Sequence, residues 1–290
     1  MSKVAQMVTD KIIALLESGV APWAQPWKSN MIPMRYIGKP YRGVNFLMLM
    51  DSPFPTPIWL SYKMAQQLGG NVKAGAAGTK IVYYKMMQAT SSHDPKPENE
   101  KYGKRPLLLY STVFNLEQTD DVPLPEWYDP EVSVQFNPIE AADAVIKNMP
   151  QPPTINHGGN KASYNPKSDT VSMPTPESFD TAPHYYSVAF HELAHSTGHK
   201  KRLDRELTTT RNDQYAREEL VAELTASFLC AKTGIDNNTV DKTTAAYLRS
   251  WIEVLQGNSN LITSAAGAAQ KATDYITNFQ YEAEAEKETT

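Results

Sequence analysis

Residues 191–195, His-Glu-Leu-Ala-His, place two histidines four positions apart, with a glutamate directly after the first. Residues four apart lie on one face of an α-helix, so His191 and His195 can direct both imidazole rings at one point. Two imidazoles held in this way supply the first two ligands of a zinc ion, at about 2.0–2.1 Å each. Glu192 cannot share that geometry, but its carboxylate can reach a water at the ion as a general base. The segment therefore predicts a helix that carries two metal ligands and one catalytic residue.

The limits of this helix follow from the residues on either side of the motif. Asp180 and Thr181 are both able to cap its N-terminus, Pro183 falls in its first turn, and Gly198 follows its last turn. The two histidines are therefore expected in the final turns of the helix, just ahead of a glycine stop.

Two histidines leave a metal site incomplete, so the third ligand decides its class. The metzincin pattern has a third histidine where this chain has Lys201, which disfavours that class. His199 follows Gly198 directly and would need an unusual loop to reach the ion. The better source is the next predicted helix, in which residues 217–224 read Arg-Glu-Glu-Leu-Val-Ala-Glu-Leu.

Glu219 and Glu223 share a face of that second helix because they lie four residues apart. We expect Glu219 to be the third ligand, and Glu223 to orient one of the two histidines without binding the metal. The alternative is that Glu223 is the ligand and Glu219 the orienting residue. Glu218 is expected to be a solvated surface charge. Two histidines and a glutamate leave a fourth position open for water, as in catalytic zinc sites. We expect one zinc ion per chain, with another divalent metal such as Mn2+ as the alternative.

An open zinc site with a general base suits the hydrolysis of a peptide bond. Residues 162–174 predict a pair of short strands around a turn just before the motif helix, with an edge along which an extended peptide could pair through its backbone. A nuclease is disfavoured because the motif offers too few carboxylates for a two-metal phosphodiester site. Three tyrosines are candidates to stabilise an oxyanion, although packing is the simpler interpretation of each: Tyr185, Tyr186 and Tyr215.

The charge of the chain is unevenly distributed. Residues 1–85 hold ten Lys and Arg against three Asp and Glu, a local net charge of +7 in a chain whose net charge is −4. Aromatic residues are interleaved with these cations, and proteins that bind single-stranded nucleic acid need both, since cations follow the phosphates and rings stack on unpaired bases. A membrane surface is the rival interpretation, but the cations are scattered among loops rather than along an amphipathic helix. The candidate nucleic-acid-binding residues are Trp27, Lys28, Tyr41, Arg42, Lys63, Lys73 and Lys80.

A chain of 290 residues is long for one domain, and residues 120–135 concentrate acids and prolines with little periodicity. We therefore expect an α+β protein of two domains. Residues 1–128 would form a mixed α/β domain that binds single-stranded DNA, and residues 129–290 a mainly helical domain that carries the metal site. Within the first domain, residues 80–87 and 107–119 predict a pair of strands joined by a polar insert.

No feature of the sequence predicts a membrane or secreted protein. No apolar run approaches the roughly 18 to 20 residues needed to span a bilayer. The N-terminal segment has a helical apolar stripe broken by charges, unlike a signal peptide. The single cysteine, Cys230, cannot form an internal disulfide and fits a reducing compartment. We expect a cytoplasmic protein without a membrane partner.

Five segments together resemble the ArdC-type antirestriction proteins carried by conjugative plasmids. They are PWAQPWKS, KPYRGVNFLML, WLSYKMAQQLGGNVKAGAAGTKIVYYK, HELAHSTGHKKRL and YAREELVAELTASFL, and the likeness covers nearly the whole chain. The resemblance implies an N-terminal half similar to the N-terminal segment of TraC-type plasmid primases, which binds single-stranded DNA. It also implies a C-terminal zincin-like metallopeptidase domain related in fold to SPRTN-type proteases. In that domain His191 and His195 are ligands, Glu192 is the general base, and residues 218–224 supply the third ligand.

By the same resemblance, the expected function is antirestriction in the bacterial cytoplasm, which is the protection of incoming plasmid DNA from host restriction. The expected partners are single-stranded DNA and an unidentified protein substrate or host restriction component. The family does not by itself identify proteolysis as the means. The alternative is a non-enzymatic protein that coats DNA or occludes a nuclease, and whose metal site serves the structure.

Overall fold

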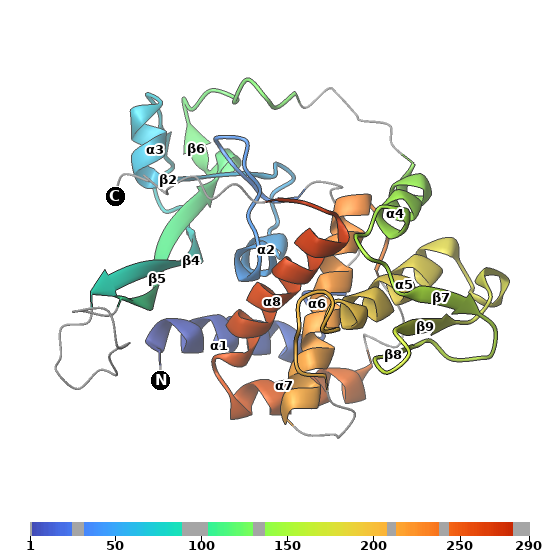
Figure 1. The fold of residues 1–290 in the computed structure, drawn as a ribbon. Helices are drawn as coiled ribbons and strands as arrows, with labels where there is room; N and C mark the ends of the chain where they lie inside the picture. Colours follow the sequence, from blue (N-terminus) through green and yellow to red (C-terminus); the bar gives the residue numbers. More distant parts are fainter. Residues whose placement is uncertain are drawn as a thin grey trace.

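The computed structural model describes residues 2–24, 32–88, 104–129, 137–207, 213–237 and 244–280. Figure 1 shows an N-terminal part that contains a four-stranded sheet and a C-terminal part dominated by long helices. The α+β fold predicted from the sequence is therefore confirmed.

The N-terminal part alternates short helices with strands. Its elements are α1 (Lys3–Glu17), β1 (Met34–Arg35), α2 (Val44–Met50), β2 (Ile58–Ser61), α3 (Tyr62–Gln67), β3 (Asn71–Val72), β4 (Thr79–Gln88), β5 (Lys104–Asn115) and β6 (Thr119–Asp120). The main sheet has the order β1-β2-β5-β4, with β1 parallel to β2 and the other neighbours antiparallel. A second, two-stranded sheet joins β3 to β6. The strand pair predicted over residues 80–87 and 107–119 is confirmed as β4 and β5, and most of its insert lies outside the described residues.

The C-terminal part surrounds one small sheet with helices. Its elements are α4 (Pro138–Lys147), β7 (Thr154–His157), β8 (Ser163–Asn165), β9 (Thr170–Met173), α5 (Ala182–Ser196), α6 (Asp213–Thr233), α7 (Ala245–Gly257) and α8 (Leu261–Ile276). β9 lies in the middle of the sheet, parallel to β7 and antiparallel to β8. The pair of short strands predicted over residues 162–174 is confirmed as β8 and β9, of which β8 lies at the edge of the sheet and β9 inside it.

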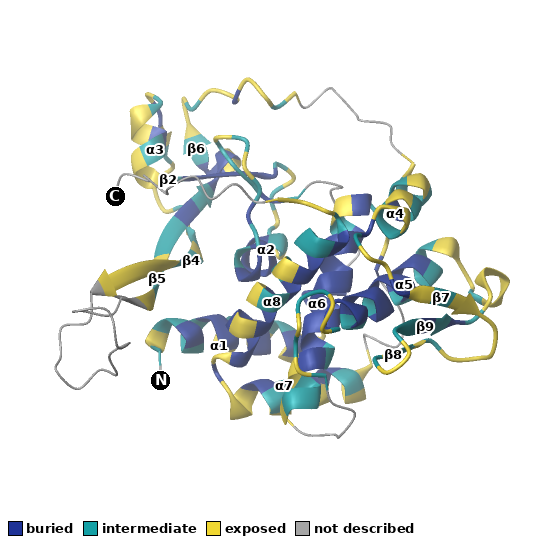
Figure 2. Ribbon diagram, in the orientation of Figure 1, coloured by how far each residue is buried: buried dark blue, intermediate teal, exposed yellow. Residues whose placement is uncertain are grey.

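The largest hydrophobic core is shared between the two parts. It packs α1 and α2 against α6, α7 and α8, and Figure 2 shows the buried residues concentrated along these helices. Trp23 is fully buried there, lies edge-on to Trp251 at 5.9 Å between ring centroids, and donates its Nε1–H to the Tyr247 hydroxyl at 2.9 Å. The first helix of the chain thus belongs to the same core as the last ones.

Helix α6 runs through the middle of this core and contacts both α5 and α8. Every residue of α6 from Leu220 to Cys230 is buried. Neither this helix nor any other in the described part of the chain is long and apolar enough to cross a membrane. Because α5 packs along α6, the N-terminal turns of α6 come to lie beside the histidine motif.

Candidate metal centre

Helix α5 begins and ends close to the predicted limits. The Thr181 hydroxyl caps its N-terminus by accepting the His184 N–H at 3.2 Å, so Thr181 rather than Asp180 is the cap. The chain leaves the helix through Gly198, where a Cβ atom would lie only 2.6 Å from the Leu207 side chain. A larger residue at this turn would force the Leu207 side chain to shift, and both motif histidines lie in the last turns before it.

Three potential ligand atoms converge between α5 and α6. Nε2 of His191 lies 3.1 Å from Nε2 of His195, and the carboxylate oxygens of Glu219 lie 3.6 Å from the first and 3.7 Å from the second. Two ligands about 2.1 Å from a common ion at tetrahedral angles lie about 3.4 Å apart, so the three residues fit a divalent ion. In the part of the chain that the structure describes, no other three His, Cys, Asp or Glu residues converge in this way. The side chains are 15% to 28% exposed, so solvent reaches the site.

Glu219 is held as an anion beside the two histidines. Burial alone would raise the pKa of its carboxyl group. The hydrogen bond to His191, the charges of His191 and His195, and a hydrogen bond from Tyr215 outweigh that effect and lower the pKa below its ordinary value. Because the ionised carboxylate is the form that binds a metal, the surroundings of Glu219 favour ligation.

Glu218 is buried behind His195, so the expectation of a solvated charge is wrong. Its Oε1 lies 3.4 Å from Nδ1 of His195, and Arg205 donates to its two oxygens from Nε at 3.0 Å and Nη2 at 2.7 Å. Burial raises the pKa of Glu218, but the hydrogen bonds with His195 and Arg205 outweigh it and hold the pKa below its ordinary value. An anionic Glu218 accepts the Nδ1–H of His195, which leaves the lone pair of Nε2 directed at the site.

Arg205 also connects this carboxylate to the end of α5. It donates from Nη1 to Oγ1 of Thr197 at 2.6 Å and from Nη2 to the carbonyl of Ala194 at 2.9 Å. A cation at a helix C-terminus is stabilised by the unpaired carbonyl groups there. The sequence carries no periodic signal for this role, because Arg205 lies between the two helices. Reasoning from the sequence therefore missed both Arg205 and the position of Glu218.

The remaining residues of the motif region lie outside the converging group. Glu192 is buried on α5, with 8% of its surface exposed. Glu223 is buried in the shared core, where it accepts a hydrogen bond from Tyr247. His199 lies in the turn after α5, and its Nδ1 accepts the backbone N–H of Lys201 at 3.2 Å. Glu218, which the sequence did not suggest for this role, contacts a motif histidine in an orienting position.

The three candidate tyrosines have different surroundings. The Tyr185 hydroxyl lies 2.9 Å from Nε2 of His157, and the Tyr186 hydroxyl donates to Asp143 at 2.7 Å. Both rings pack among other aromatic residues, as the simpler interpretation predicts. Tyr215 differs, since it hydrogen-bonds Glu219 at the metal centre.

Two of the predicted nucleic-acid-binding residues, Tyr41 and Arg42, instead contact other residues of the protein. Tyr41 is only 5% exposed, and the guanidinium of Arg35 lies 5.5 Å from its ring centroid, so the ring is not available to stack on a base. Arg42 forms an ion pair with Asp274 of α8 and lies 5.3 Å from the ring centroid of Phe279. These contacts correct the expectation for Tyr41 and give Arg42 a role between the two parts of the chain.

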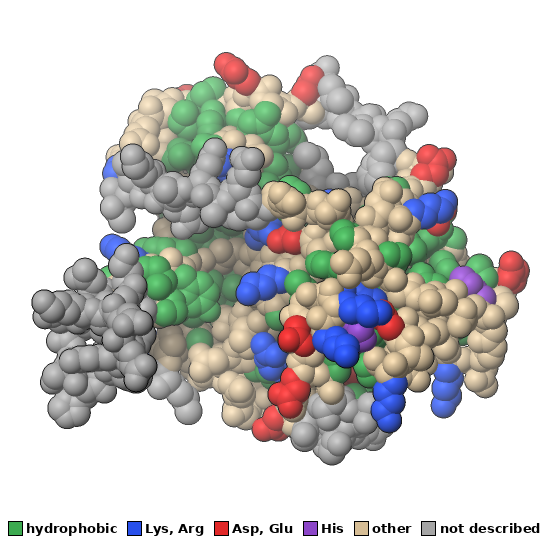
Figure 3. All heavy atoms as spheres, viewed as in Figure 1, with side chains coloured by type: hydrophobic (Ala, Val, Ile, Leu, Met, Phe, Trp, Pro, Cys, Tyr) green, Lys and Arg blue, Asp and Glu red, His purple; other side chains and the backbone are tan. Residues whose placement is uncertain are grey.

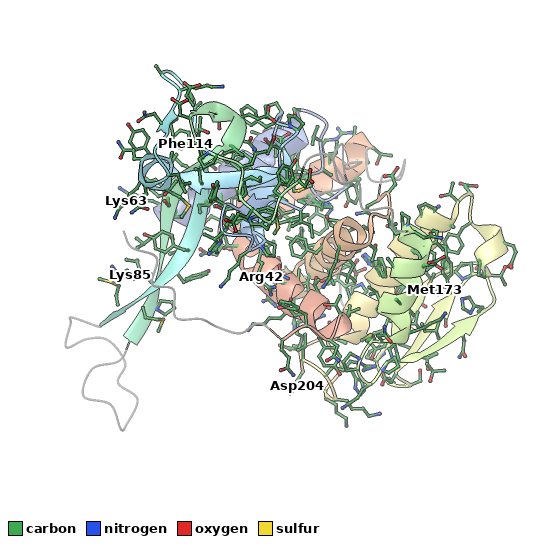
Figure 4. All side chains as sticks on the ribbon, turned by 90° about the horizontal axis from the view of Figure 1, so that it is seen from above. Arg42, Lys63, Lys85, Phe114, Met173 and Asp204 are labelled. Carbon is green, nitrogen blue, oxygen red and sulfur yellow. The ribbon has the colours of Figure 1, made fainter. Side chains whose placement is uncertain are left out.

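The other nucleic-acid candidates divide into exposed lysines and residues without a described position. Lys63, Lys73 and Lys80 are exposed, and Lys73 donates from Nζ to a backbone carbonyl at 2.9 Å. Figure 4 shows Lys63 near the outer edge of the molecule, whereas Arg42 lies toward the middle. Trp27 and Lys28 lie outside the described residues.

Replacing Arg42 with alanine is expected to lower the free energy of unfolding by about 1 kcal/mol or less, because the ion pair with Asp274 is partly open to water. The two side chains are 24% and 20% exposed. Urea unfolding at low and high salt measures the effect, which should shrink as salt screens the pair. Lys63→Ala is the control, with unchanged stability. Unchanged stability of Arg42→Ala together with weaker binding to DNA would instead place Arg42 on a nucleic-acid surface.

Comparison with known proteins classifies both parts of the chain. Residues 2–114 match the N-terminal domain of anti-restriction factor ArdC, and residues 140–268 match the zincin-like metallopeptidases. The fold and the converging ligands on α5 and α6 therefore belong to a zincin-like metallopeptidase domain that follows an ArdC-type N-terminal domain.

Solved structures and relatives extend this match to nearly the full length. The Mn(II)-bound crystal structure of the antirestriction ArdC protein from the R388 plasmid is 34% identical with a TM-score of 0.75, covering 96% of this chain and 98% of that one. The metal-free structure of the same protein has a TM-score of 0.76. The uncharacterized protein y4eC of Sinorhizobium fredii is 32% identical over 93% of this chain and 90% of its own length. This protein belongs to the ArdC family of antirestriction proteins.

DNA primases are also among the relatives. Two proteins named DNA primase TraC from Escherichia coli are 34% and 33% identical over 95% of this chain. The chain spans only 27% and 20% of their lengths, so it corresponds to one segment of each primase.

Proposed function

We propose that this protein acts in antirestriction as a DNA-associated metallopeptidase. Residues 1–128 bind single-stranded DNA, and residues 129–290 hold a divalent metal ion and cleave a protein close to that DNA. The observation that supports catalysis is the convergence of His191, His195 and Glu219 between α5, which also carries the buried Glu192, and α6. Three protein ligands leave a coordination position for substrate, whereas structural zinc sites are usually closed by four.

Zinc is the metal that we assign to this centre, with one ion per chain. Two imidazole nitrogens and a carboxylate form the ligand set of several zinc peptidases, and the distances between the donor atoms suit tetrahedral coordination. Manganese is the alternative, since the related R388 protein has been crystallised with Mn(II). When bound, either ion supplies Lewis-acid polarisation of a substrate carbonyl and makes water more acidic.

In this proposal, residues of the chain bind the metal, orient a ligand and transfer a proton. His191 and His195 bind through Nε2, and Glu218 with Arg205 holds the ring of His195 in that orientation. Glu192 accepts the proton of the water that attacks the peptide carbonyl and then delivers it to the leaving amine nitrogen.

The edge strand β8 is the proposed support for the substrate chain. It pairs with β9 on one side only among the described strands, and it packs on α5. An extended peptide that added itself to this edge would gain backbone hydrogen bonds and run past the histidine helix. The substrate is thus an extended or locally unfolded segment of a protein.

The first test of this function is Glu192→Gln, which removes the base and keeps the size of the side chain. We expect unchanged metal content and a loss of protein hydrolysis of about 10²–10⁴-fold. The assay uses an unfolded protein with and without a single-stranded oligonucleotide, and elemental analysis reports the metal. Glu177→Gln, at an exposed position before α5, is the matched control. If Glu192→Gln protects DNA from restriction in cells as well as the unaltered protein does, the non-enzymatic alternative is correct.

A further inference from the structure

Strands β4 and β5 form a long ribbon whose outer half carries exposed apolar side chains. Ten residue pairs join the strands, from Thr79 opposite Val113 to Gln88 opposite Lys104. Close to the core the ribbon is covered, since Val82 is buried and both of its backbone groups are hydrogen-bonded by the Asn45 side chain of α2. Further out, the exposed large side chains on the two strands are Tyr84, Met86, Met87, Leu107 and Tyr110. Figure 1 shows this end of the ribbon projecting from the rest of the molecule.

Tyr84 and Tyr110 lie on the same face of the ribbon. The register pairs Val82 with Tyr110 and Tyr84 with Leu108, so the two tyrosines are diagonal neighbours across the strands. Their relative exposures are 59% and 51%, so both rings are open to solvent. Lys80 shares this face, and its Nζ lies 5.1 Å from the ring centroid of Tyr110.

The ribbon is also free of negative charge in its sequence. The two strands contain four cationic residues and no Asp or Glu, although acids outnumber bases in the chain as a whole. The four are Lys80, Lys85, Lys104 and Arg105. Figure 4 shows Lys85 on the same side of the molecule as Lys63 of α3. In a chain of net negative charge, a polyanion is attracted to a segment with such a local excess of positive charge.

We propose that the ribbon face of Lys80, Tyr84 and Tyr110 is a base-stacking platform for single-stranded nucleic acid. This inference rests on the proposed DNA-binding function and assigns that function to a particular surface. The two tyrosines of this surface were not among the candidates that the charge pattern suggested. Rings exposed beside cations suit unpaired bases, because stacking needs an open base face and the cation neutralises the neighbouring phosphate. A duplex offers no such face within its stack. Figure 3 shows hydrophobic side chains gathered where the ribbon leaves the body of the molecule.

The test measures binding of a fluorescent oligo(dT) strand by anisotropy. The double variant Tyr84→Ala, Tyr110→Ala is expected to bind at least about tenfold more weakly, because each lost stack weakens binding several-fold to about a hundredfold. Tyr84→Phe, Tyr110→Phe keeps both rings and should bind like the unaltered protein. Tyr62→Ala is the matched control, since Tyr62 is 50% exposed but lies on α3. An equal loss in Tyr62→Ala would overturn the platform, as would an equal loss in the phenylalanine variant.

A second probe separates stacking from charge. An abasic strand with the same number of phosphates should bind the unaltered protein more weakly than oligo(dT), whereas the double alanine variant should bind both strands equally. If the variant still prefers oligo(dT), the bases stack elsewhere and the inference is wrong while the proposed DNA binding stands. If the unaltered protein binds neither strand, the proposed DNA binding is itself wrong. Thermal unfolding of each variant checks the fold.

Discussion

Replacing His191 with alanine is expected to weaken divalent metal binding by more than about a hundredfold. Loss of a residue that merely orients a ligand typically costs about 10–100-fold in affinity, so loss of a ligand itself should cost more. The remaining pair, His195 and Glu219, has donor atoms 3.7 Å apart. An ion held by this pair alone would have only two protein ligands. Titration calorimetry with Zn2+ and Mn2+ measures the affinity. Thermal unfolding adds a second readout, because an ion that binds only the folded state raises the midpoint in the unaltered protein.

His199→Ala is the control for this prediction. His199 contacts the backbone N–H of Lys201 in the turn after α5 and does not belong to the converging group. Its replacement should leave the metal affinity and the metal-induced rise in midpoint unchanged. Full affinity in His191→Ala, or loss of affinity in His199→Ala, would show that the ligand set is wrong.

Replacing Arg205 with alanine is expected to lower the free energy of unfolding by about 3–5 kcal/mol, because it leaves the buried carboxylate of Glu218 without its partner. The two side chains are 11% and 7% exposed, so water compensates poorly for the loss. The same substitution frees the His195 ring, and metal affinity should fall about 10–100-fold. Urea unfolding and metal titration of the folded variant measure the two effects separately.

Arg202→Ala provides the matched control for Arg205. The guanidinium of Arg202 is fully buried and donates to Asp169 at 2.6 Å, so its removal should also destabilise the fold. Arg202 has no contact with the histidine motif among its hydrogen bonds, and metal affinity should be unchanged. A similar loss of affinity in both variants would mean that general destabilisation, and not the orientation of His195, weakens the site.

The part of the metal centre that lies within one helix could be predicted from the sequence. His191 and His195 lie one turn apart on a single helix, so their spacing alone brings their rings together. Glu219, the third ligand expected from the sequence, lies on another helix, and the choice between it and Glu223 depends on how α6 crosses α5. A sequence read one helix at a time cannot specify that crossing. The burial of α6 from Leu220 to Cys230 added to the difficulty, because its sequence has no polar face against which to orient the glutamates.

The proposed nucleic-acid surface was harder to predict. The sequence gives the number of charged and aromatic residues in a segment, but binding depends on which of these side chains are exposed. The local excess of positive charge over residues 1–85 is a property of the sequence. Its location on the surface is not, since packing buries Tyr41 and pairs Arg42 with Asp274, more than two hundred residues away. The register of β4 and β5 likewise brings Tyr84 and Tyr110 onto one face.

By itself, the sequence indicated the α+β fold class, and its resemblance to known proteins indicated the family. The spacing of residues within one helix predicted His191 and His195 as ligands with Glu192 beside them. Only the tertiary structure decided that Glu219 meets the histidines, that Glu218 and Arg205 support them, and that the first helix joins the core of the last three. The physical reason is the same in each case. These contacts join segments far apart in the chain, and they exist only after burial of apolar side chains has fixed how the helices and strands pack.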